Sequence, residues 1–443
     1  MTCQKLSLGV IVCKTFKMLL KTKAQQKWNL RDIAMKMKLF MTSVLSTSLL
    51  LTACGGGSSD DSPVTTNPSG TPANNIQNPV VKVDAYTSTN LGSVAAESSV
   101  LTYKMLGQSG QEVQATSLVF TPNTPPPTGG WPIVVWAHGT TGVADACAPS
   151  KAVLTDSTKD LISKLLAAGY VVVAPDYEGL GTSGIHPFLN VKSEAFSITD
   201  AVVATRNYLS QRNLLTSKKW LTVGHSQGGH AALSAAQYAS RAQLDYKGTV
   251  AVAPASNLGF ILVAGEQAVA NATIDKKIPM YAQLDTYTAL VTAGIRNTQP
   301  SFNYSQVFTS QTESTAQQAE TICAGPLAQA LAVNMQTYAA THGGTLDGFT
   351  RTQPNFMTVP LVKTFLDKDS QPLQAKVSTP IIIYQGLADT TVPKVATDIL
   401  ISNATVVGTK INSYVTGNWD HNTAMSSNVD NIVGNVQTLL TAQ

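Results

Sequence analysis

The sequence VGHSQGGHAAL (residues 223–233) holds one serine, Ser226, between two glycines. The apolar run WLTV before it predicts a buried strand, and the small residues after it predict a helix. A serine at so sharp a strand-to-helix turn needs strained backbone angles and small neighbours, which Gly224 and Gly228 supply. Gly-x-Ser-x-Gly alone arises easily by chance in a chain with 31 glycines. Its position between strand and helix therefore predicts that Ser226 is a nucleophile.

Buried strands and amphipathic helices alternate around this segment. The runs WPIVVWAHG, YVVVAPDYEG and GTVAVAPAS are typical of strands covered on both faces, and the segments between them have helical spacing. Alternating apolar and polar residues from residue 80 to residue 122 predict antiparallel strands at the start. The pattern predicts an α/β fold, with a mostly parallel central sheet and helices on both faces.

The alternation of strands and helices stops near Ala255 and returns with STPIIIYQGLAD at residues 378–389. A connection of roughly 120 residues cannot be a simple loop in a compact domain. We therefore expect residues 80–254 and 379–443 to form one core. Residues 255–378 are expected to form a mainly helical cap inserted into it.

A nucleophilic serine needs a base, and the base needs an acid that orients it. In sheets of this kind the acid and then the histidine follow the serine, each at the end of a later strand. PIIIYQGLAD presents Asp389 in such a place, and KINSYVTGNWDH presents His421. Asp420 fits the acid role less well, because adjacent side chains on an extended segment point in opposite directions. We predict the triad Ser226, Asp389 and His421, with a turn-forming aspartate and a surface histidine as the alternatives.

The segment WAHGTTG (residues 136–142) follows the first central strand. Its glycines let backbone N–H groups turn toward a substrate oxygen. We predict an oxyanion hole formed by the backbone N–H groups of Thr140 and Gln227. Thr141 is the alternative to Thr140, and a plain glycine-rich turn is the alternative to an oxyanion hole.

Two carboxylates in PDYEGLG, Asp176 and Glu178, could form a pair for acid–base chemistry. We favour a structural role, in which Asp176 accepts hydrogen bonds within the turn after its strand. Metal and phosphate sites have no support, since the sequence contains no HExxH, no CxxC and no glycine-rich phosphate loop. We expect neither a metal nor a cofactor.

The segment MKMKLFMTSVLSTSLLLTAC (residues 35–54) has a basic start and an apolar run too short for a comfortable membrane span. It predicts a signal peptide over residues 35–53, after an upstream extension of residues 1–34. The ending LTAC resembles the lipobox of bacterial lipoproteins, which would make Cys54 the lipidated residue. An ordinary signal peptide with a chance cysteine is the alternative.

Residues 54–79 are rich in Gly, Ser, Pro and Asn, and predict a flexible tether. We expect an exported protein held on a membrane surface by a lipid anchor. The formal charge of +4 comes largely from basic residues before residue 39. Because no basic stripe remains on the folded part, we expect no nucleic-acid partner.

Two cysteines, Cys147 and Cys323, lie in the expected folded part. Disulfides persist in exported proteins, and an even number of cysteines favours a bridge. Closing so long a loop stabilises a fold by on the order of 5 kcal/mol in the chain-entropy treatment. We predict a disulfide between them, with two free buried cysteines as the alternative.

The motifs HGTTG with ACAPS, PDYEGLGTSGIHPF, GHSQGG, GLADTTVP and the late His421 together resemble the secretory lipase family of α/β-hydrolases. The resemblance covers roughly residues 80–443. It implies an α/β-hydrolase fold, hydrolysis of carboxylic esters (often acylglycerols), and a cap that forms an acyl-binding tunnel. It also implies a disulfide from the oxyanion turn to the cap, which Cys147 and Cys323 match.

The chain departs from this family in two respects. A lipid anchor is not a defining feature of the family, and the cap sequence is too divergent to carry over substrate contacts. A short-chain esterase therefore remains open beside a true lipase. A peptidase on the same scaffold and a non-catalytic surface binding lipoprotein are the alternatives from other classes.

Overall fold

The computed structural model describes residues 70–442, and a nine-stranded sheet forms the centre of this part. The strands are β1 (Val80–Ala85), β2 (Ala95–Leu106), β3 (Glu112–Pro122), β4 (Trp131–Ala137), β5 (Val171–Pro175), β6 (Thr216–His225), β7 (Asp245–Val252), β8 (Ile381–Gly386) and β9 (Ser413–Gly417). Their order in the sheet is β1-β2-β3-β5-β4-β6-β7-β8-β9. In this order, the neighbouring pairs from β1–β2 to β3–β5 are antiparallel, and those from β5–β4 to β8–β9 are parallel.

The burial of each strand follows its sequence pattern. Every residue of β5 and β8 is buried, as expected of strands covered on both faces. β2 alternates between buried and partly exposed residues over its second half, as expected of a strand with one wet face. The predicted mostly parallel sheet with antiparallel strands at its start is confirmed.

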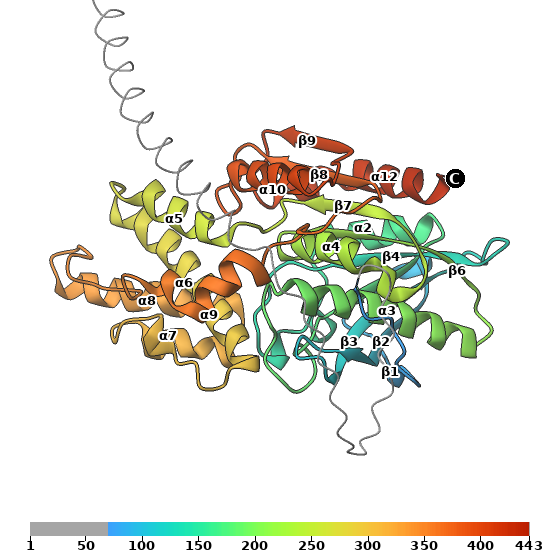
Figure 1. Cartoon of the computed structure of the whole chain (residues 1–443), viewed down its shortest axis with the longest axis horizontal. Helices are drawn as coiled ribbons and strands as arrows, with labels where there is room; N and C mark the ends of the chain where they lie inside the picture. The colour runs from blue at the N-terminus through green and yellow to red at the C-terminus, as the bar shows by residue number, and fades with distance from the viewer. Residues whose placement is uncertain (1–69, 443) are drawn as a thin grey trace, which may run out of the picture. The chain divides into compact units, whose positions relative to one another are not determined.

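Helices cover both faces of the sheet (Figure 1). Successive residues of β4 point to opposite faces, so Ile133 and Val135 pack in one core and Val134 and Trp136 in the other. The first core is closed by α3 (Val191–Gln211), α4 (Gln227–Tyr238) and α10 (Lys394–Val406). The second is closed by α2 (Asp156–Ala167), α11 (Thr423–Ser426) and α12 (Val429–Thr441).

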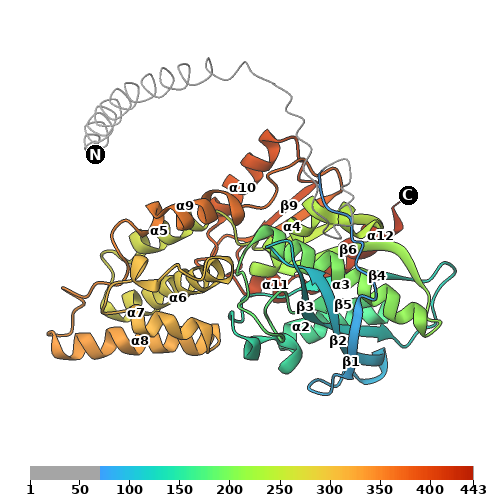
Figure 2. The same cartoon turned by 60° about the horizontal axis from the view of Figure 1, so that its bottom comes forward.

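The segment between β7 and β8 forms a mainly helical cap beside the sheet (Figures 1 and 2). It has an apolar core of its own, to which Leu290, Phe308 and Leu331 belong. Its longer elements are α5 (Leu258–Val269), α6 (Ile274–Thr298), α7 (Glu313–Ala316), α8 (Ala324–Thr341), α9 (Pro360–Thr364) and the π-helical turn η8 (Phe365–Asp369). The short 3₁₀ turns of the described chain are η1 (Gly92–Val94), η2 (Asp145–Cys147), η3 (Pro149–Lys151), η4 (Ala239–Ala242), η5 (Tyr304–Gln306), η6 (Gln317–Glu320) and η7 (Phe356–Thr358).

A disulfide joins the cap to the sheet. Cys147 of η2 is bonded to Cys323, the residue before α8, with Cα atoms 5.4 Å apart. Gly142 lies against this bond, because a Cβ at that position would come within 2.8 Å of the Cys147 sulfur. The predicted bridge is confirmed, and the alternative of two free cysteines is wrong.

The described chain begins against the core rather than in a free tether. Arg241 is almost fully buried and forms a bidentate pair with Asp200, with N–O distances of 2.7 and 2.8 Å. It also donates to the carbonyl of Pro72, and its own carbonyl accepts from the N–H of Asn74. The expected tether of residues 54–79 therefore includes, from residue 71 on, a stretch fixed to the core. The predicted signal peptide and Cys54 lie outside the described residues.

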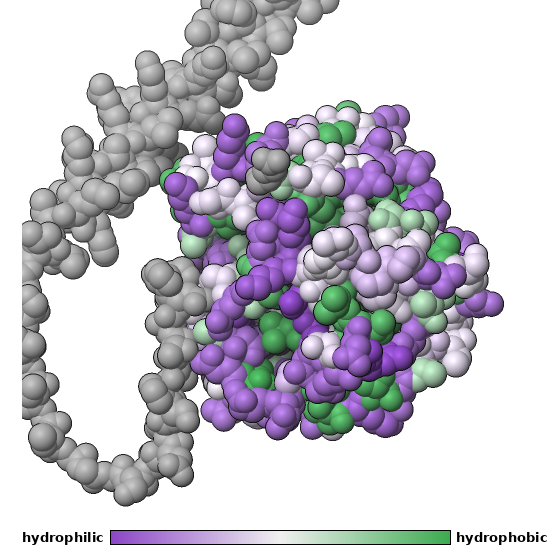
Figure 3. All heavy atoms as spheres, turned by 90° about the vertical axis from the view of Figure 1, so that its right-hand side faces the viewer, coloured by the Kyte–Doolittle hydropathy of each residue, from purple (hydrophilic) through white to green (hydrophobic). Residues whose placement is uncertain are grey.

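The surface on the side away from the cap mixes hydrophilic and hydrophobic residues (Figure 3). This agrees with a chain in which charged residues make up only 13% of the sequence. Within residues 70–442, no helix is long and apolar enough to span a membrane.

The N-terminus of α4 crosses β4 and β6 at a distance that only glycine permits. A Cβ at Gly224 would lie 1.9 Å from the Gly228 carbonyl oxygen, and a Cβ at Gly228 would lie 1.8 Å from the Ala137 carbonyl oxygen. Real Cβ atoms do not approach backbone this closely, so a larger residue must push the helix away from the strands. The two glycines around Ser226 are thus required by packing.

We expect Gly228→Ala to lower the free energy of unfolding by about 3 kcal/mol or more, because α4 and β4 would have to separate. Urea denaturation of the purified protein measures this. Gly434→Ala is the matched control, since a Cβ at that exposed position in α12 meets nothing within 4 Å. That substitution should raise the stability by about 0.5–1 kcal/mol. Equal stability of Gly228→Ala and the wild type would contradict the packing argument.

Candidate active site

Ser226 occupies the turn between β6 and α4 in a strained conformation, with φ +59° and ψ −120°. Residues other than glycine rarely adopt such angles, and they persist only where the surroundings hold them. Here the Ser226 N–H donates to the carbonyl of Val252 at 2.9 Å. The Ser226 carbonyl accepts from the N–H groups of His230 and Ala255, each at 3.1 Å. These three bonds fix the turn from both sides and leave the side chain partly exposed.

Asp389 and His421 meet at the carboxyl ends of β8 and β9. The Nδ1 of His421 lies 2.8 Å from Oδ2 of Asp389. The other carboxylate oxygen accepts from the N–H groups of Thr391 and Val392, at 2.9 and 2.8 Å. Because Nδ1 faces a buried carboxylate, it carries the proton and Nε2 is left as a base. The structure therefore brings the predicted acid and base together.

His225 holds His421 beside the serine. Its Nε2 donates to the carbonyl of His421 at 2.8 Å, and the two rings lie 4.7 Å apart. Burial, with a smaller contribution from His421, lowers the pKa of His225 to about 4, so that its ring is neutral at neutral pH. Among residues 70–442 the Ser226 hydroxyl makes no hydrogen bond. Ser226 and His421 are therefore connected through His225, which precedes the serine and bonds the His421 carbonyl, and not by a direct bond.

The predicted oxyanion turn lies against the serine. A Cβ placed on Gly139 would be 3.8 Å from the Cβ of Ser226. Within residues 70–442, the backbone N–H groups of Thr140 and Gln227 bind no other residue, which leaves both available to a ligand. The Thr141 carbonyl accepts from the N–H of Ala324 at 2.8 Å, which ties this turn to the cap, while the Thr141 N–H, the alternative donor, likewise has no partner within residues 70–442.

The carboxylates of PDYEGLG have separate structural partners. Asp176 accepts from the Thr116 hydroxyl at 2.6 Å and from the Ser150 N–H at 2.9 Å. Glu178 instead accepts from the hydroxyl of Ser193 at 2.6 Å. Asp176 has a structural role, but its partners lie in β3 and η3 rather than in the turn after its strand, and the two side chains do not form a pair. Burial raises the pKa of Asp176 to about 6.

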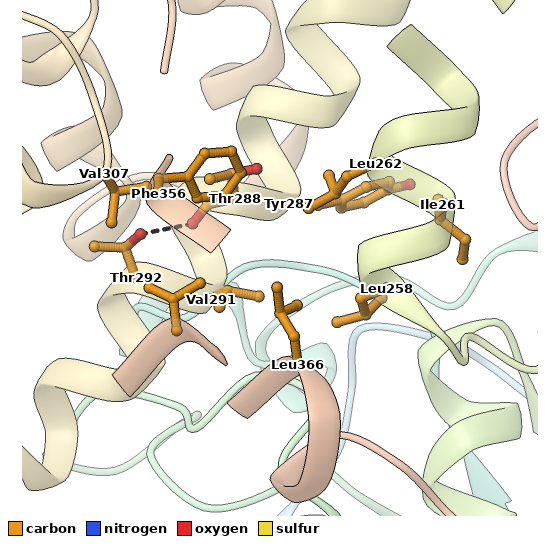
Figure 4. Close-up of a pocket in the computed structure, with 11 residues that line it drawn as sticks. Leu258, Ile261, Leu262, Tyr287, Thr288, Val291, Thr292, Val307, Phe356 and Leu366 are labelled. Atoms are coloured by element: carbon orange, nitrogen blue, oxygen red, sulfur yellow. Dashed lines mark hydrogen bonds between the residues drawn. The ribbon is translucent and has the colours of Figure 1, made fainter. Parts of the chain in front are cut away.

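An apolar pocket lies in the cap between α5, α6 and η8 (Figure 4). Leu258, Ile261 and Leu262 line it from α5, and Val291 lines it from α6. Two threonines in the lining donate their hydroxyls to carbonyls of their own helix. The Thr292 hydroxyl, for example, donates to the Thr288 carbonyl at 2.8 Å (Figure 4). The pocket therefore offers an almost wholly apolar wall.

A hydrogen-bonded bridge joins this pocket to the acid. Gln283 of α6 donates to the hydroxyl of Tyr287, which lines the pocket, at 3.0 Å. It also contacts the hydroxyl of Thr391 at 3.1 Å, and the N–H of Thr391 donates to Asp389. The cap pocket and the triad acid thus share one connected group of residues.

The secretory lipase family matches residues 145–428, which include the serine turn, the whole cap and the predicted triad. The chain belongs to this family. Membership in the secretory lipase family makes it a hydrolase of ester substrates.

Solved structures resemble the chain in fold. Lipase A of Candida antarctica in its closed state has a TM-score of 0.62 at 17% identity, over 84% of this chain and 85% of that chain. The rice cell wall degrading esterase LipA of Xanthomonas oryzae has a TM-score of 0.57 at 17% identity, over 82% of this chain and 98% of that chain. These likenesses confirm the predicted α/β-hydrolase fold. The comparison with curated proteins gave no match.

Three residues of the site were not found from the sequence: His225, Glu194 and His186. The sequence predicts no role for any of the three. Glu194 of α3 and His186 of the loop before it both contact the side chain of Gln227. The GHS triplet was the one local signal for His225. Nothing local marks the other two, because their partners on α4 are more than 30 residues away.

The raised pKa of Asp176 predicts that the stability of the folded protein depends on pH. This pKa rises from 3.8 in the unfolded chain to about 6 in the folded protein. The folded state therefore holds this proton more tightly, so the contribution of Asp176 to stability is present below pH 4 and is lost as the pH rises through 6. We expect the stability of Asp176→Asn relative to the wild type to increase by about 2 kcal/mol between pH 4 and pH 7. Urea denaturation across this range tests it, and a difference that does not change with pH would refute it.

Proposed function

We propose that the chain is an exported serine hydrolase that cleaves carboxylic esters through an acyl-enzyme intermediate. The observation that carries the proposal is the 2.8 Å contact between His421 and buried Asp389, beside a serine in a strained strand-to-helix turn. Such a turn lifts a serine hydroxyl above the sheet, at a helix N-terminus that favours developing negative charge. Membership in the secretory lipase family supports the choice of an ester as substrate.

In this mechanism the Ser226 oxygen attacks the ester carbonyl while Nε2 of His421 takes its proton. Asp389 keeps Nδ1 protonated and stabilises the imidazolium that forms. The oxyanion accepts hydrogen bonds from the backbone N–H groups of Thr140 and Gln227. His421 then protonates the leaving alcohol, and water activated by the same histidine hydrolyses the acyl-enzyme. Catalytic contacts that are open in a free enzyme close when substrate binds, so the serine–histidine bond forms in that complex.

We assign the acyl group of the substrate to the apolar cap pocket, whose side chains must move apart to admit it, because the space between them is only about 20 Å³ in this structure. An acyl chain has no polar atoms beyond its carbonyl, and the pocket wall between α5 and α6 offers almost none in return. The bridge through Gln283 and Thr391 connects this pocket to the acid of the triad. In this proposal the bond to be cleaved lies near the triad while the acyl chain extends into the cap.

Export and lipid anchoring remain part of the proposal. The signal peptide over residues 35–53 and the lipobox cysteine Cys54 are read from the sequence alone. The secretory lipase family supports export. A lipid on Cys54 would hold the enzyme on a membrane surface without a spanning segment.

Ser226→Ala should lower the rate of p-nitrophenyl ester hydrolysis by several orders of magnitude, because no nucleophile would remain. The melting temperature should stay close to that of the wild type, since the alanine keeps the backbone turn. Hydrolysis is followed by nitrophenolate release. A variant that still cleaves the ester at the wild-type rate would reject the assignment of Ser226.

Two further measurements separate the alternatives from other classes. A fluorophosphonate probe should label the wild type and not Ser226→Ala, whereas a non-catalytic binding lipoprotein would not be labelled at all. An anilide of the same acyl group should be cleaved far more slowly than the ester. Faster cleavage of the anilide would favour a peptidase.

Val291→Phe tests the acyl assignment. The larger ring would fill the apolar pocket, so we expect the preference for a palmitate ester over an acetate ester to fall about tenfold or more in kcat/KM. Val333→Phe is the matched control, because that valine is half exposed on α8 and does not line the pocket. An unchanged chain-length profile in Val291→Phe would place the acyl chain elsewhere.

A further inference from the structure

A buried polar network lies directly beneath the serine turn and takes no direct part in the proposed chemistry. Its centre is Glu194 of α3, whose side chain is fully buried. Gln227 and His230 from the first turn of α4 and His186 from the loop before α3 surround it, each at most 1% exposed. Desolvating so many polar groups is costly unless they are hydrogen-bonded, and within residues 70–442 all the side-chain polar atoms of these four residues are, except the side-chain oxygen of Gln227.

The Gln227 amide can adopt only one orientation. His186 donates from Nδ1 to the Glu178 carbonyl at 2.9 Å, and burial lowers its pKa to about 3. Its Nε2 therefore bears a lone pair and accepts from the Gln227 amide nitrogen at 2.8 Å. The second proton of that nitrogen goes to Oε1 of Glu194 at 2.9 Å. A flipped amide would point its oxygen at two acceptors.

One proton lies between Glu194 and His230. The Nε2 of His230 faces the carbonyl of Ser370 at 3.1 Å, so that nitrogen donates. Its Nδ1 lies 2.5 Å from Oε2 of Glu194. This short contact joins the two side chains directly.

Glu194 therefore binds two residues of the first turn of α4, Gln227 and His230. We propose that Glu194 is a positioning residue, which acts through the Gln227 side chain to hold the backbone N–H of Gln227 in the direction of the oxyanion. This inference rests on the proposed function, in which that N–H is an oxyanion donor. The Ser226 carbonyl is fixed by His230 and Ala255 on one side of the peptide, and the Gln227 side chain fixes the other side.

The experiment uses variants that remove the side-chain contacts and keep every backbone N–H. Gln227→Ala and Glu194→Ala should each lower kcat about 10- to 100-fold, with KM within threefold, because a donor displaced by a fraction of an ångström loses most of its effect. Glu194→Gln should stay within about threefold of the wild type. Its amide can accept from Gln227 and donate to a neutral His230, so it rebuilds the network without the charge.

A second readout reports on the oxyanion alone. p-Nitrophenyl butyrate is compared with its thiono analogue, in which sulfur replaces the carbonyl oxygen. Well-placed N–H donors stabilise the oxyanion better than the larger thio-anion. The kcat/KM for the ester divided by the kcat/KM for the thiono ester should therefore fall in Gln227→Ala and Glu194→Ala. The double variant Glu194→Ala/Gln227→Ala should be no slower than the slower single variant, since both act through one contact.

Asp200→Asn is the matched control for destabilisation. Asp200 is an equally buried carboxylate on the same helix, but its charged partner is Arg241 of η4, the turn that follows α4. It should lower the melting temperature and leave kcat and the substrate ratio unchanged. All rates are taken well below the melting temperature of each variant, and Gln227→Ala decides the matter if Glu194→Ala does not fold.

The inference is overturned if Gln227→Ala and Glu194→Ala behave like Asp200→Asn, with lower melting temperatures but unchanged kcat and substrate ratio. It is equally overturned by additive losses in the double variant, or by Glu194→Gln being as slow as Glu194→Ala. These outcomes concern only the positioning role. The proposed function itself is tested separately, by whether wild-type ester hydrolysis depends on Ser226.

Discussion

The close crossing of α4 over β4 and β6 is the constraint on which the site depends. Backbone atoms meet there at distances that exclude any Cβ at Gly224 or Gly228, and this crossing forces Ser226 to φ +59°. The strain can persist because both peptide groups of Ser226 are hydrogen-bonded to neighbouring elements. The same crossing leaves the first N–H groups of α4 without helical partners, which makes the helix N-terminus a place for negative charge. The proposed nucleophile and the proposed oxyanion site thus depend on the same packing contact.

Most of this fold could be predicted from the sequence, since its elements follow short-range patterns. Parallel strands such as β5 read as continuous apolar runs because helices cover them on both sides. No prediction covers α10, whose sequence KVATDILISNATV is rich in β-branched and polar residues. Tertiary packing makes it a helix, since Leu400 and Ala404 close the core beside β8 and Ala396 packs in the core of the cap. The start of the fixed chain was also placed too late, because the buried Arg241 that holds it lies far along the sequence.

The residues of the candidate site could likewise be predicted from the sequence only in part. Asp389 and His421 could be found because the fold type puts an acid and a histidine at the ends of particular strands. His225, Glu194 and His186 could not, because their roles lie in contacts between distant segments. A buried glutamate on a helix looks in sequence like any surface glutamate. Only the structure shows that Glu194 meets Gln227 and that His225 meets the carbonyl of His421.

The cap contacts the same elements that hold these residues, so it cannot be treated as a cover over a finished site. The N–H of Ala324, one residue after the disulfide, is bonded to Thr141 in the oxyanion turn. Gln283 contacts the turn of the acid through Thr391, and the carbonyl of Ser370 closes the network beneath α4. A rigid displacement of the whole cap would break bonds to all three parts of the site at once. These hydrogen bonds between the cap and the core therefore hold the turns of the core in place, while the helices of the cap also line the apolar pocket.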